Sequence, residues 1–357
     1  MKINISQKNK KVLVGISGGV DSSVAAILLK EKGYEVEGVF AKVWQPDFIE
    51  CTWRDEMKDA MRVCAKLDIP FHFLDLEKEY KAYVGDYMIE EYKNGRTPNP
   101  DVMCNTHIKF GFIYKYAIEH GFDFVATGHY CQNIDEQLHR GLDSNKDQSY
   151  FLWNVAKEKF KHILFPVGGL EKNKVRKIAQ KHNLFTAEKK DSQGLCFIGP
   201  IDMKSFLKQL IPTKPGSVLN SGGQIIGEHE GAVLYTVGER HGFTIFPHFK
   251  QIQEQALYVI DKNITDNTIT VDVQTYPIKE VELVNSNFFS SIKSGDVEVQ
   301  FRYRQTPLKA HLEEKNGTYK IILKDEMEFI AMGQSAVFYK DTMCIGGAIV
   351  DKVISLK

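Results

Sequence analysis

Apolar and polar positions follow two different rhythms along the first 130 residues of the chain. Continuous apolar runs, rich in Val and Phe, are typical of strands buried on both faces and occupy residues 12–16, 36–40, 71–74 and 124–127. Apolar side chains recur at helical spacing between these runs, in residues 22–32, 55–67, 77–93 and 106–120. Gly33 and Gly121 follow two of the helices, a common way to end one. Strands that alternate with helices predict an α/β fold with a parallel sheet.

The rhythm changes after residue 127. Residues 131–140 predict a hairpin, residues 150–183 predict one or two helices around a break at 165–169, and residues 212–231, rich in Gly, Pro and Ser, predict loops and turns. Short alternating segments then recur and predict an all-β domain, a small barrel, from residue 257 onward: 258–261, 268–273, 297–303, 319–323 and 335–339.

Length and composition limit what this chain can be. At roughly 150 residues per domain, 357 residues suggest two or three domains, with a boundary near 199–205. The formal net charge is zero, whereas nucleic-acid-binding domains usually carry a basic excess, so composition alone argues weakly against such a partner. No apolar run approaches the roughly 20 residues that span a bilayer, and the basic N-terminus lacks the apolar core of a signal peptide. We expect a cytoplasmic protein without membrane attachment.

Six cysteines are distributed without any CxxC pair, which disfavours a disulfide framework and a zinc ribbon. Cys104 follows a stiff loop, residues 95–105, in which Pro98 and Pro100 are expected to prevent a helix. It is therefore predicted to start the helix 106–120, where the helix dipole, helped by Lys109, lowers the pKa of a thiol. Asp101 can reach the same site. Cys196 follows two lysines and Gly194 in a polar segment. The remaining cysteines are interpreted as structural: Cys51, Cys64, Cys131 and Cys344.

The segment SGGVDSS, residues 17–23, lies between the first predicted strand and the first predicted helix. Gly18 and Gly19 permit positive φ and close approach to a ligand, and a serine near the helix N-terminus favours an anion. The segment has no Gly-Lys-Ser/Thr and is not a Walker A loop. Asp21 adds a carboxylate that suits Mg²⁺. A serine-capped glycine turn is the alternative interpretation.

This segment resembles the PP-loop of ATP pyrophosphatases, which cleave ATP between the α and β phosphates and transfer AMP to an oxygen. Further segments make the resemblance more specific, and the chain is similar to the tRNA-specific 2-thiouridylase family nearly end to end: GRTPNPDVMCNTHIKFG, ATGHY, RGLDSNKDQSYFLW, LFPVGGLEKNKVRKIA, KKDSQGLCFIG, GEHEGAVLYTVGERHG, RYRQTPL and GQSAVFY.

The resemblance implies three domains: a PP-loop domain over residues 1–204, a small central domain over 205–277 and a C-terminal β-barrel over 278–357. It also implies an ATP site built from Gly15, Ile16, Ser17, Gly18, Gly19, Val20, Asp21, Ser22, Ala41 and Gly128. Ala41 stands where relatives often have methionine, so its contact with adenine is expected to be weaker. The residues expected to meet tRNA are Asn99, Pro100, Asp101, His129, Lys146, Asp147, Gln148, Arg302, Tyr303 and Gln334.

The activity that the resemblance implies is thiolation of wobble uridine 34 in tRNA, with ATP and Mg²⁺ as cofactors. Adenylation turns the C2 oxygen into a leaving group, and a Cys196 persulfide, loaded by a donor protein, supplies the sulfur. Cys104 then either attacks Cys196 and closes a disulfide, or first frees hydrosulfide that attacks C2. Asp101 is the expected general acid/base. The products are 2-thiouridine, AMP and pyrophosphate.

Residues 157–190 contain ten Lys or Arg against three Glu, which favours contact with RNA phosphates despite the zero net charge; a solvated helical face is the bland alternative. Three other readings stay open. The first is that the chain is a PP-loop enzyme that acts on a small molecule. The second is that it is an RNA-binding protein with an inactive loop. The third is that Asp101, Cys104 and Cys196 hold an iron–sulfur cluster. The chain is compatible with a monomer.

Overall fold

The computed structural model describes residues 9–49, 52–191, 194, 196, 199, 201–249, 256–290 and 294–355. Contacts divide the chain into two compact units. The first comprises residues 1–85, 100–200 and 339–346, and the second comprises residues 86–99, 201–338 and 347–357. The three-domain boundaries drawn from the resemblance remain a prediction.

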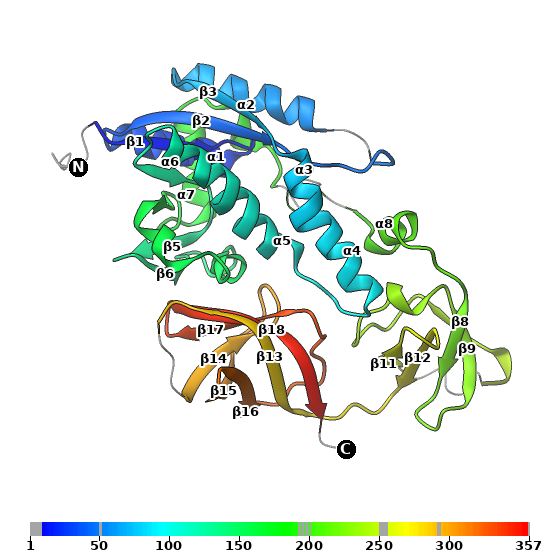
Figure 1. Ribbon diagram of the computed structural model, residues 1–357. Helices are drawn as coiled ribbons and strands as arrows, with labels where there is room; N and C mark the ends of the chain where they lie inside the picture. Colours follow the sequence, from blue (N-terminus) through cyan, green and yellow to red (C-terminus); the bar gives the residue numbers. More distant parts are fainter. Residues whose placement is uncertain are drawn as a thin grey trace. The chain divides into compact units, whose positions relative to one another are not determined.

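The first unit contains a five-stranded sheet in the order β3-β2-β1-β4-β7, and every neighbouring pair is parallel (Figure 1). Its strands are β1 (Lys11–Gly15), β2 (Glu35–Lys42), β3 (Phe71–Asp75), β4 (Phe124–Ala126) and β7 (Ile163–Leu164). Val12, Leu13 and Val14 are fully buried although successive side chains of a strand point to opposite faces. Both faces are therefore covered, which confirms the predicted α/β fold.

The helices of this unit follow the predicted pattern at its beginning and depart from it later. α1 (Val20–Glu31) and α2 (Trp53–Leu67) match the expectation, and the hairpin of β5 (Cys131–Ile134) and β6 (Gln137–Arg140) was also predicted. The remaining helical elements are α3 (Glu77–Tyr80), a π-helical segment η2 (Lys81–Gly85), α5 (Pro100–Met103), a second π-helical segment η3 (Cys104–Ile113), α6 (Tyr114–Glu119), η4 (Ser149–Leu152), η5 (Lys157–His162), α7 (Lys172–Lys181) and η6 (Phe185–Glu188).

Two expectations for this unit were wrong. The prediction of one or two helices over residues 150–183 missed β7, whose two residues are too few to show a period. The predicted stiff loop over residues 95–105 is confirmed only as far as residue 99 and wrong beyond it, because a helix begins at Pro100. Proline is tolerated in the first turn of a helix, where the missing N–H has no intrahelical partner in any case.

The second unit contains α4 (Asp86–Lys93), α8 (Met203–Leu210) and two β structures. A five-stranded sheet has the order β10-β9-β8-β12-β11. Its strands are β8 (Gly216–Leu219), β9 (Ile225–His229), β10 (Phe243–Ile245), β11 (Tyr258–Asn263) and β12 (Thr268–Asp272), and two short turns, η7 (Ala232–Leu234) and η8 (Pro247–Phe249), lie beside them in sequence. β8 and β9 correct the prediction that residues 212–231 form only loops, and β11 and β12 belong to this sheet rather than to the barrel.

The predicted β-barrel is confirmed. Its strands follow the order β13-β16-β15-β14-β17-β18, and an additional pairing of β13 with β18 closes it. They are β13 (Ile278–Phe288), β14 (Gly295–Gln300), β15 (Leu308–Lys315), β16 (Thr318–Leu323), β17 (Ser335–Lys340) and β18 (Met343–Ser355). The tip of the β17–β18 hairpin is counted with the first unit, where Met343 pairs with His139. In the described part of the chain, no helix is long and apolar enough to cross a membrane.

Candidate active site

The turn between β1 and α1 is the predicted phosphate loop. Gly18 has φ +72°, and a Cβ there would lie 2.9 Å from Asp59 Cβ, so both backbone and space require glycine. Gly19 occupies the N-cap of α1 with φ −95°, and no side chain caps the helix. The hydroxyls of Ser22 and Ser23 instead donate to Gly19 O at 3.2 and 2.7 Å. The first-turn N–H groups thus have no side-chain cap, the arrangement in which helix N-termini bind phosphate.

The turn after β4 packs directly against this loop. A Cβ on Gly128 would lie 2.6 Å from Ser22 N and 2.7 Å from Asp21 C. Because β4 is parallel to β1 and beside it, the carboxyl ends of both strands lie at one edge of the sheet, where ligands of open α/β folds bind. Ala41 lies near the carboxyl end of β2 and is 4% exposed. The fold thus brings the predicted ATP residues to one edge, and their contact with ATP stays a prediction.

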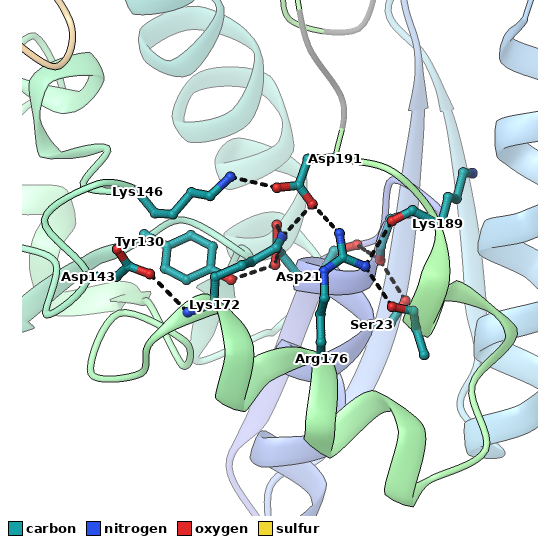
Figure 2. A network of polar contacts seen from close by, with 12 residues as sticks. Asp21, Ser23, Tyr130, Asp143, Lys146, Lys172, Arg176, Lys189 and Asp191 are labelled. Atoms are coloured by element: carbon teal, nitrogen blue, oxygen red, sulfur yellow. Dashed lines mark hydrogen bonds and ion pairs between the residues drawn. The ribbon is translucent and has the colours of Figure 1, made fainter.

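Asp21 is engaged by a network of polar side chains (Figure 2). Tyr130 donates its hydroxyl to Asp21 Oδ1 at 2.7 Å, and Lys172 Nζ lies 2.7 and 2.8 Å from the two carboxylate oxygens. Lys172 Nζ also lies 2.8 Å from Asp191 Oδ1. The Lys172 ammonium, 12% exposed, therefore bridges two carboxylates from distant parts of the chain.

Asp191 gathers three cations in this network. Lys146 Nζ lies 2.6 Å from Oδ2, and Arg176 donates to Oδ1 at 2.7 Å, beside Lys172. Burial would raise the pKa of Asp191, but hydrogen bonds from Lys146 and Lys172 outweigh it and lower the pKa to about 2. Asp191 is therefore a carboxylate at every physiological pH. Close by, Lys189 Nζ binds Gly18 O at 3.1 Å and Asp59 Oδ2 at 2.8 Å. These bonds attach the segment that leads to Cys196 directly to the phosphate loop.

The same network bears on the predicted magnesium ion. Asp21 is the carboxylate of the loop, and both of its oxygens already accept from Lys172. An ion at Asp21 would have to replace that ammonium, so the residues fit a nucleotide better than they fit Mg²⁺ in this arrangement.

Cys104 and Cys196 meet in the first unit with their sulfur atoms 3.1 Å apart. Both are free thiols, since a disulfide would need about 2.05 Å. The backbone of Cys196 is held on both sides: its N–H donates to Asp101 Oδ1 at 2.9 Å, and its carbonyl accepts from the Tyr80 hydroxyl at 2.8 Å. The three residues predicted as catalytic, Asp101, Cys104 and Cys196, therefore lie together.

The two thiols differ in access and in charge. Cys104 is completely buried, whereas Cys196 is partly exposed. Burial raises the pKa of Cys104 well above its usual value. The pKa of Cys196 is lowered, first by the hydrogen bond from Cys104, against the effect of burial, and further by the charge of Lys109. Cys196 is thus the more acidic of the two thiols, and Cys104 is the one that donates to it. The predicted lowering of the Cys104 pKa by a helix N-terminus is wrong, because α5 places a helical turn before it.

Several residues predicted to meet RNA brace the first unit in this structure. Asp147 is 7% exposed and accepts from Gly141 N, Ser149 N and Arg140. Gln148 Oε1 accepts from Tyr130 N at 3.0 Å. His129 is 7% exposed and has both ring nitrogens within hydrogen-bonding distance of a side chain. Lys146 is likewise paired with Asp191. The contact of these four residues with RNA remains a prediction.

The other predicted RNA residues lie in the second unit, apart from Pro100 and Asp101 in α5. Gln334 donates to Thr97 O at 3.1 Å. Arg302 is exposed, and Arg304 stacks its guanidinium over the Tyr303 ring at 5.0 Å. A pocket of about 200 Å³ is lined by Thr236, Val237, Gly238, Glu239, Arg302, Ala331 and Gln334. Asn99 precedes α5 and belongs to this unit by contacts. The contact of these residues with RNA remains a prediction.

Sequence reasoning missed three residues that the structure places at the site: Tyr80, Tyr130 and Lys172. Tyr130 and Lys172 stand inside the quoted segments ATGHY and LEKNKVRKIA, so their position in a motif was the available signal. Tyr80 carried no signal, because its partner is a backbone carbonyl 116 positions away. Among the residues that the structure describes, no group of three or more His, Cys, Asp or Glu side chains is arranged to hold a metal ion. The iron–sulfur cluster stays an alternative from the sequence.

Three family descriptions match consecutive parts of the chain. They are "tRNA methyl transferase HUP domain" over residues 10–200, "tRNA methyl transferase PRC-barrel domain" over 204–272 and "Aminomethyltransferase beta-barrel domain" over 278–350.

Full-length relatives carry a different activity in their names. "tRNA-specific 2-thiouridylase MnmA 1" of Geobacillus kaustophilus is 43% identical over 98% of this chain and 97% of its own length. "tRNA-specific 2-thiouridylase MnmA" of Idiomarina loihiensis is 41% identical over 98% of both chains. Among solved structures, a U34-tRNA thiolase from Methanococcus maripaludis matches 58% of this chain and 68% of its own at 21% identity, with a TM-score of only 0.37.

Replacing Gly128 by alanine should weaken nucleotide binding. The new methyl group would meet Ser22 N at 2.6 Å and push on the phosphate loop. Overpacking of this kind costs about 1–3 kcal/mol, so we expect the Kd for ATP, measured by isothermal titration calorimetry, to rise about tenfold or more. Gly169→Ala is the matched control, since its nearest atom beyond the chain neighbours is Gln132 Oε1 at 3.8 Å. Equal affinities of the two variants would contradict a nucleotide site here.

Asp191→Asn should loosen the segment that leads to Cys196. An amide cannot replace the carboxylate that three cations share, so local opening becomes easier. Trypsin should then cleave after Lys189 or Lys190 at least several-fold faster under native conditions. Asp55→Asn, which removes an exposed carboxylate paired only locally with Lys58, serves as the control. Cleavage at the wild-type rate would show that the network does not secure this segment.

Proposed function

The chain belongs to the family of tRNA-specific 2-thiouridylases, and we propose that it is an ATP-dependent tRNA-uridine 2-sulfurtransferase. It adenylates C2 of wobble uridine 34 and replaces the oxygen with sulfur from a Cys196 persulfide, releasing AMP and pyrophosphate. The observation that carries this proposal is the pair of thiols, 3.1 Å apart, in the unit that also contains the phosphate loop. Thiolation needs a sulfur atom that is first accepted and then released, and two facing thiols can do both.

The first half of the reaction uses the edge of the parallel sheet. The amides of the loop over residues 15–22 and the N-terminus of α1 are suited to the phosphates of ATP. Gly128 lets the turn after β4 pack directly against this loop. Negative charge develops on the leaving pyrophosphate, and preorganised N–H donors there lower the barrier. The adenylated C2 oxygen then leaves as AMP.

The second half assigns different roles to the two cysteines. The Cys196 thiolate is the sulfur that a donor protein can reach, and it accepts sulfane sulfur as a persulfide. The terminal sulfur attacks C2 and forms a C2–S bond as the C2–O bond to AMP breaks. Cys104, after losing its proton, attacks Sγ of Cys196. The S–S bond to the transferred sulfur breaks, its electron pair stays on the sulfur bound to C2, and a Cys104–Cys196 disulfide remains.

Asp101 has two tasks in this scheme: it holds the backbone of Cys196, and it acts as a general base. It holds the Cys196 N–H in the present arrangement. Burial raises the pKa of its carboxyl, although the Cys196 N–H and Lys109 counteract the rise. A carboxylate of raised pKa is a better base, so Asp101 is suited to take the proton of Cys104 or of the target base. The disulfide must be reduced after each turnover, and we place the reaction in the reducing cytoplasm for that reason.

Wobble uridine would reach this site with its backbone anchored on basic residues. The exposed lysines of α7, Lys174, Lys177 and Lys181, belong to the basic stretch 157–190. We propose that they bind RNA phosphates, together with the predicted contacts at Arg302, Tyr303 and Gln334.

Two other activities compete with this proposal. The matching families are named for tRNA methyl transfer, and the sequence left a PP-loop enzyme that acts on a small molecule as an alternative. Methyl transfer has no use for two thiols that exchange sulfur, and a small substrate does not call for a basic stretch and two β domains. The relatives of the same length are named for thiolation of tRNA.

Cysteine variants should separate the two halves of the reaction. Cys196→Ser should abolish 2-thiouridine, measured by mass spectrometry of digested tRNA, while tRNA-dependent release of pyrophosphate from ATP continues. Cys104→Ser should also release pyrophosphate but stall with sulfur linked between Cys196 and the base. Cys64→Ala, in a buried structural cysteine of α2, should retain thiolation. Full thiolation by Cys196→Ser, or pyrophosphate release without tRNA at the same rate, would contradict the proposal.

Binding of tRNA should weaken steeply with salt, because phosphate contacts release counterions. Lys177→Gln combined with Lys181→Gln should lower the slope of log K against log salt by about 2, one unit per lost phosphate contact. The same change at the exposed Lys58 and Lys66 of α2 should leave the slope unchanged. Equal slopes for both double variants would place the RNA away from α7.

A further inference from the structure

The segment η3 is a π-helix, and it sets which side chains face the sulfur atoms. Cys104 begins η3 and Lys109 follows five positions later. In an α-helix two residues five apart differ in direction by about 140° around the axis. The i→i+5 hydrogen bonds of a π-helix put more residues into each turn and so reduce this difference in direction, and π-helical turns occur frequently at functional sites. This winding turns Lys109 toward the side of the helix that carries Cys104.

Lys109 is a cation that interacts with both sulfurs. Its side chain hydrogen-bonds the Cys196 side chain and interacts with the charges of Cys104 and Asp101. Burial opposes its charge, but these three groups outweigh that effect and raise its pKa, so the side chain is an ammonium. A positive charge in a partly buried place of this kind stabilises a neighbouring anion far more than it would in water.

His129 holds Lys109 from the other side. The imidazole Nε2 lies 3.3 Å from Lys109 Nζ, and Nδ1 lies 2.7 Å from Thr127 Oγ1. Burial and the charge of Lys109 lower the pKa of His129 well below its usual value, so the ring is neutral. An ammonium has only donors, so Nε2 accepts from Lys109 and Nδ1–H donates to Thr127. The neutral ring fixes the direction of the ammonium and adds no second charge.

We propose that Lys109 is a catalytic residue that keeps the reacting sulfur of Cys196 anionic, and that His129 is the positioning residue that holds Lys109. This inference rests on the proposed function, because it assigns the charge needed for its sulfur-transfer step. The Lys109 ammonium stabilises the Cys196 thiolate that accepts sulfur and then the terminal persulfide anion that attacks C2. When Cys104 loses its proton to Asp101 or solvent, the same ammonium faces the new thiolate until the disulfide forms. Lys109 transfers no proton and is unchanged at the end.

The pH dependence of Cys196 alkylation measures this charge effect without ATP, tRNA or a sulfur donor. Iodoacetamide reacts with the thiolate, and mass spectrometry of the Cys196 peptide gives its rate at each pH. Lys109→Met removes the charge with little change in length and should move the midpoint to higher pH by about one unit or more, with about tenfold slower alkylation near neutral pH. Lys109→Arg keeps the charge and should keep the midpoint near that of the wild type. Lys115→Met, an exposed lysine of α6, is the control and should match the wild type.

His129→Leu should raise the midpoint by less than Lys109→Met, since the ammonium remains but loses its acceptor. A single-turnover assay tests the transfer step itself, with the enzyme first loaded with sulfur from inorganic polysulfide. Lys109→Met should then form 2-thiouridine more slowly, while its tRNA-dependent release of pyrophosphate stays within about twofold of the wild type. If Lys109 had a purely structural role, its loss would change folding or binding. It would not produce the combination of a shifted pH profile in Lys109→Met and an unshifted profile in Lys109→Arg.

Two results would overturn the inference: a Lys109→Met profile that coincides with the wild type, or a Lys109→Arg midpoint that rises as far as that of Lys109→Met. Where Lys109→Met fails to fold, Lys109→Arg is compared with the wild type alone, and an Arg midpoint that lies about one unit or more above the wild-type midpoint overturns the inference. Failure of the proposed function gives a different pattern, because the wild-type enzyme itself would then form no 2-thiouridine although its alkylation profile could still depend on Lys109.

Discussion

The contact between Cys104 and Cys196 joins residues that are 92 positions apart, and the first unit is built so that this contact can exist. Cys104 is fixed by its helix, whereas Cys196 itself lies in a turn outside any described helix or strand. Its backbone is therefore held by two side chains that reach from other elements, Tyr80 and Asp101. Two hydrogen bonds on opposite sides of one residue limit both its position and its rotation, which is what two reacting sulfur atoms require.

Charge pairing links this contact to the phosphate loop. The segment that leads to Cys196 carries Asp191 and Lys189, and both reach the loop, one through Lys172 and the other directly. Isolated surface ion pairs contribute little, but a network of partly buried charges with several hydrogen bonds to each carboxylate is a stronger constraint. The loop that would bind ATP and the cysteine that would carry sulfur are therefore parts of one connected polar structure.

The sequence predicted elements that are determined locally and missed those determined by distant contacts. The buried strands and α1 followed from apolar periodicity, and the barrel from short alternating segments. Pro100 was misread because a proline both stops a helix and starts one, and only the following residues distinguish the two. The π-helical winding of η3 has no period in the sequence that separates it from an α-helix, so the sequence named Lys109 beside Cys104 but not the winding that directs it. The motif residues Asp101, Cys104 and Cys196 were named correctly as neighbours, whereas Tyr80, which binds only a backbone carbonyl, left no pattern.

The different environments of the two cysteines have a consequence for the order of events. A buried thiol with a raised pKa reacts slowly with any electrophile, and a partly exposed thiolate reacts fast. If both were equally reactive, sulfur would be loaded on either and a disulfide would form before any substrate arrived. In the proposed scheme Cys104 stays protonated behind Cys196, so incoming sulfur would meet only Cys196. The attack by Cys104 must then wait until Cys196 bears a sulfur that can leave, so the same burial that silences Cys104 also places its reaction last.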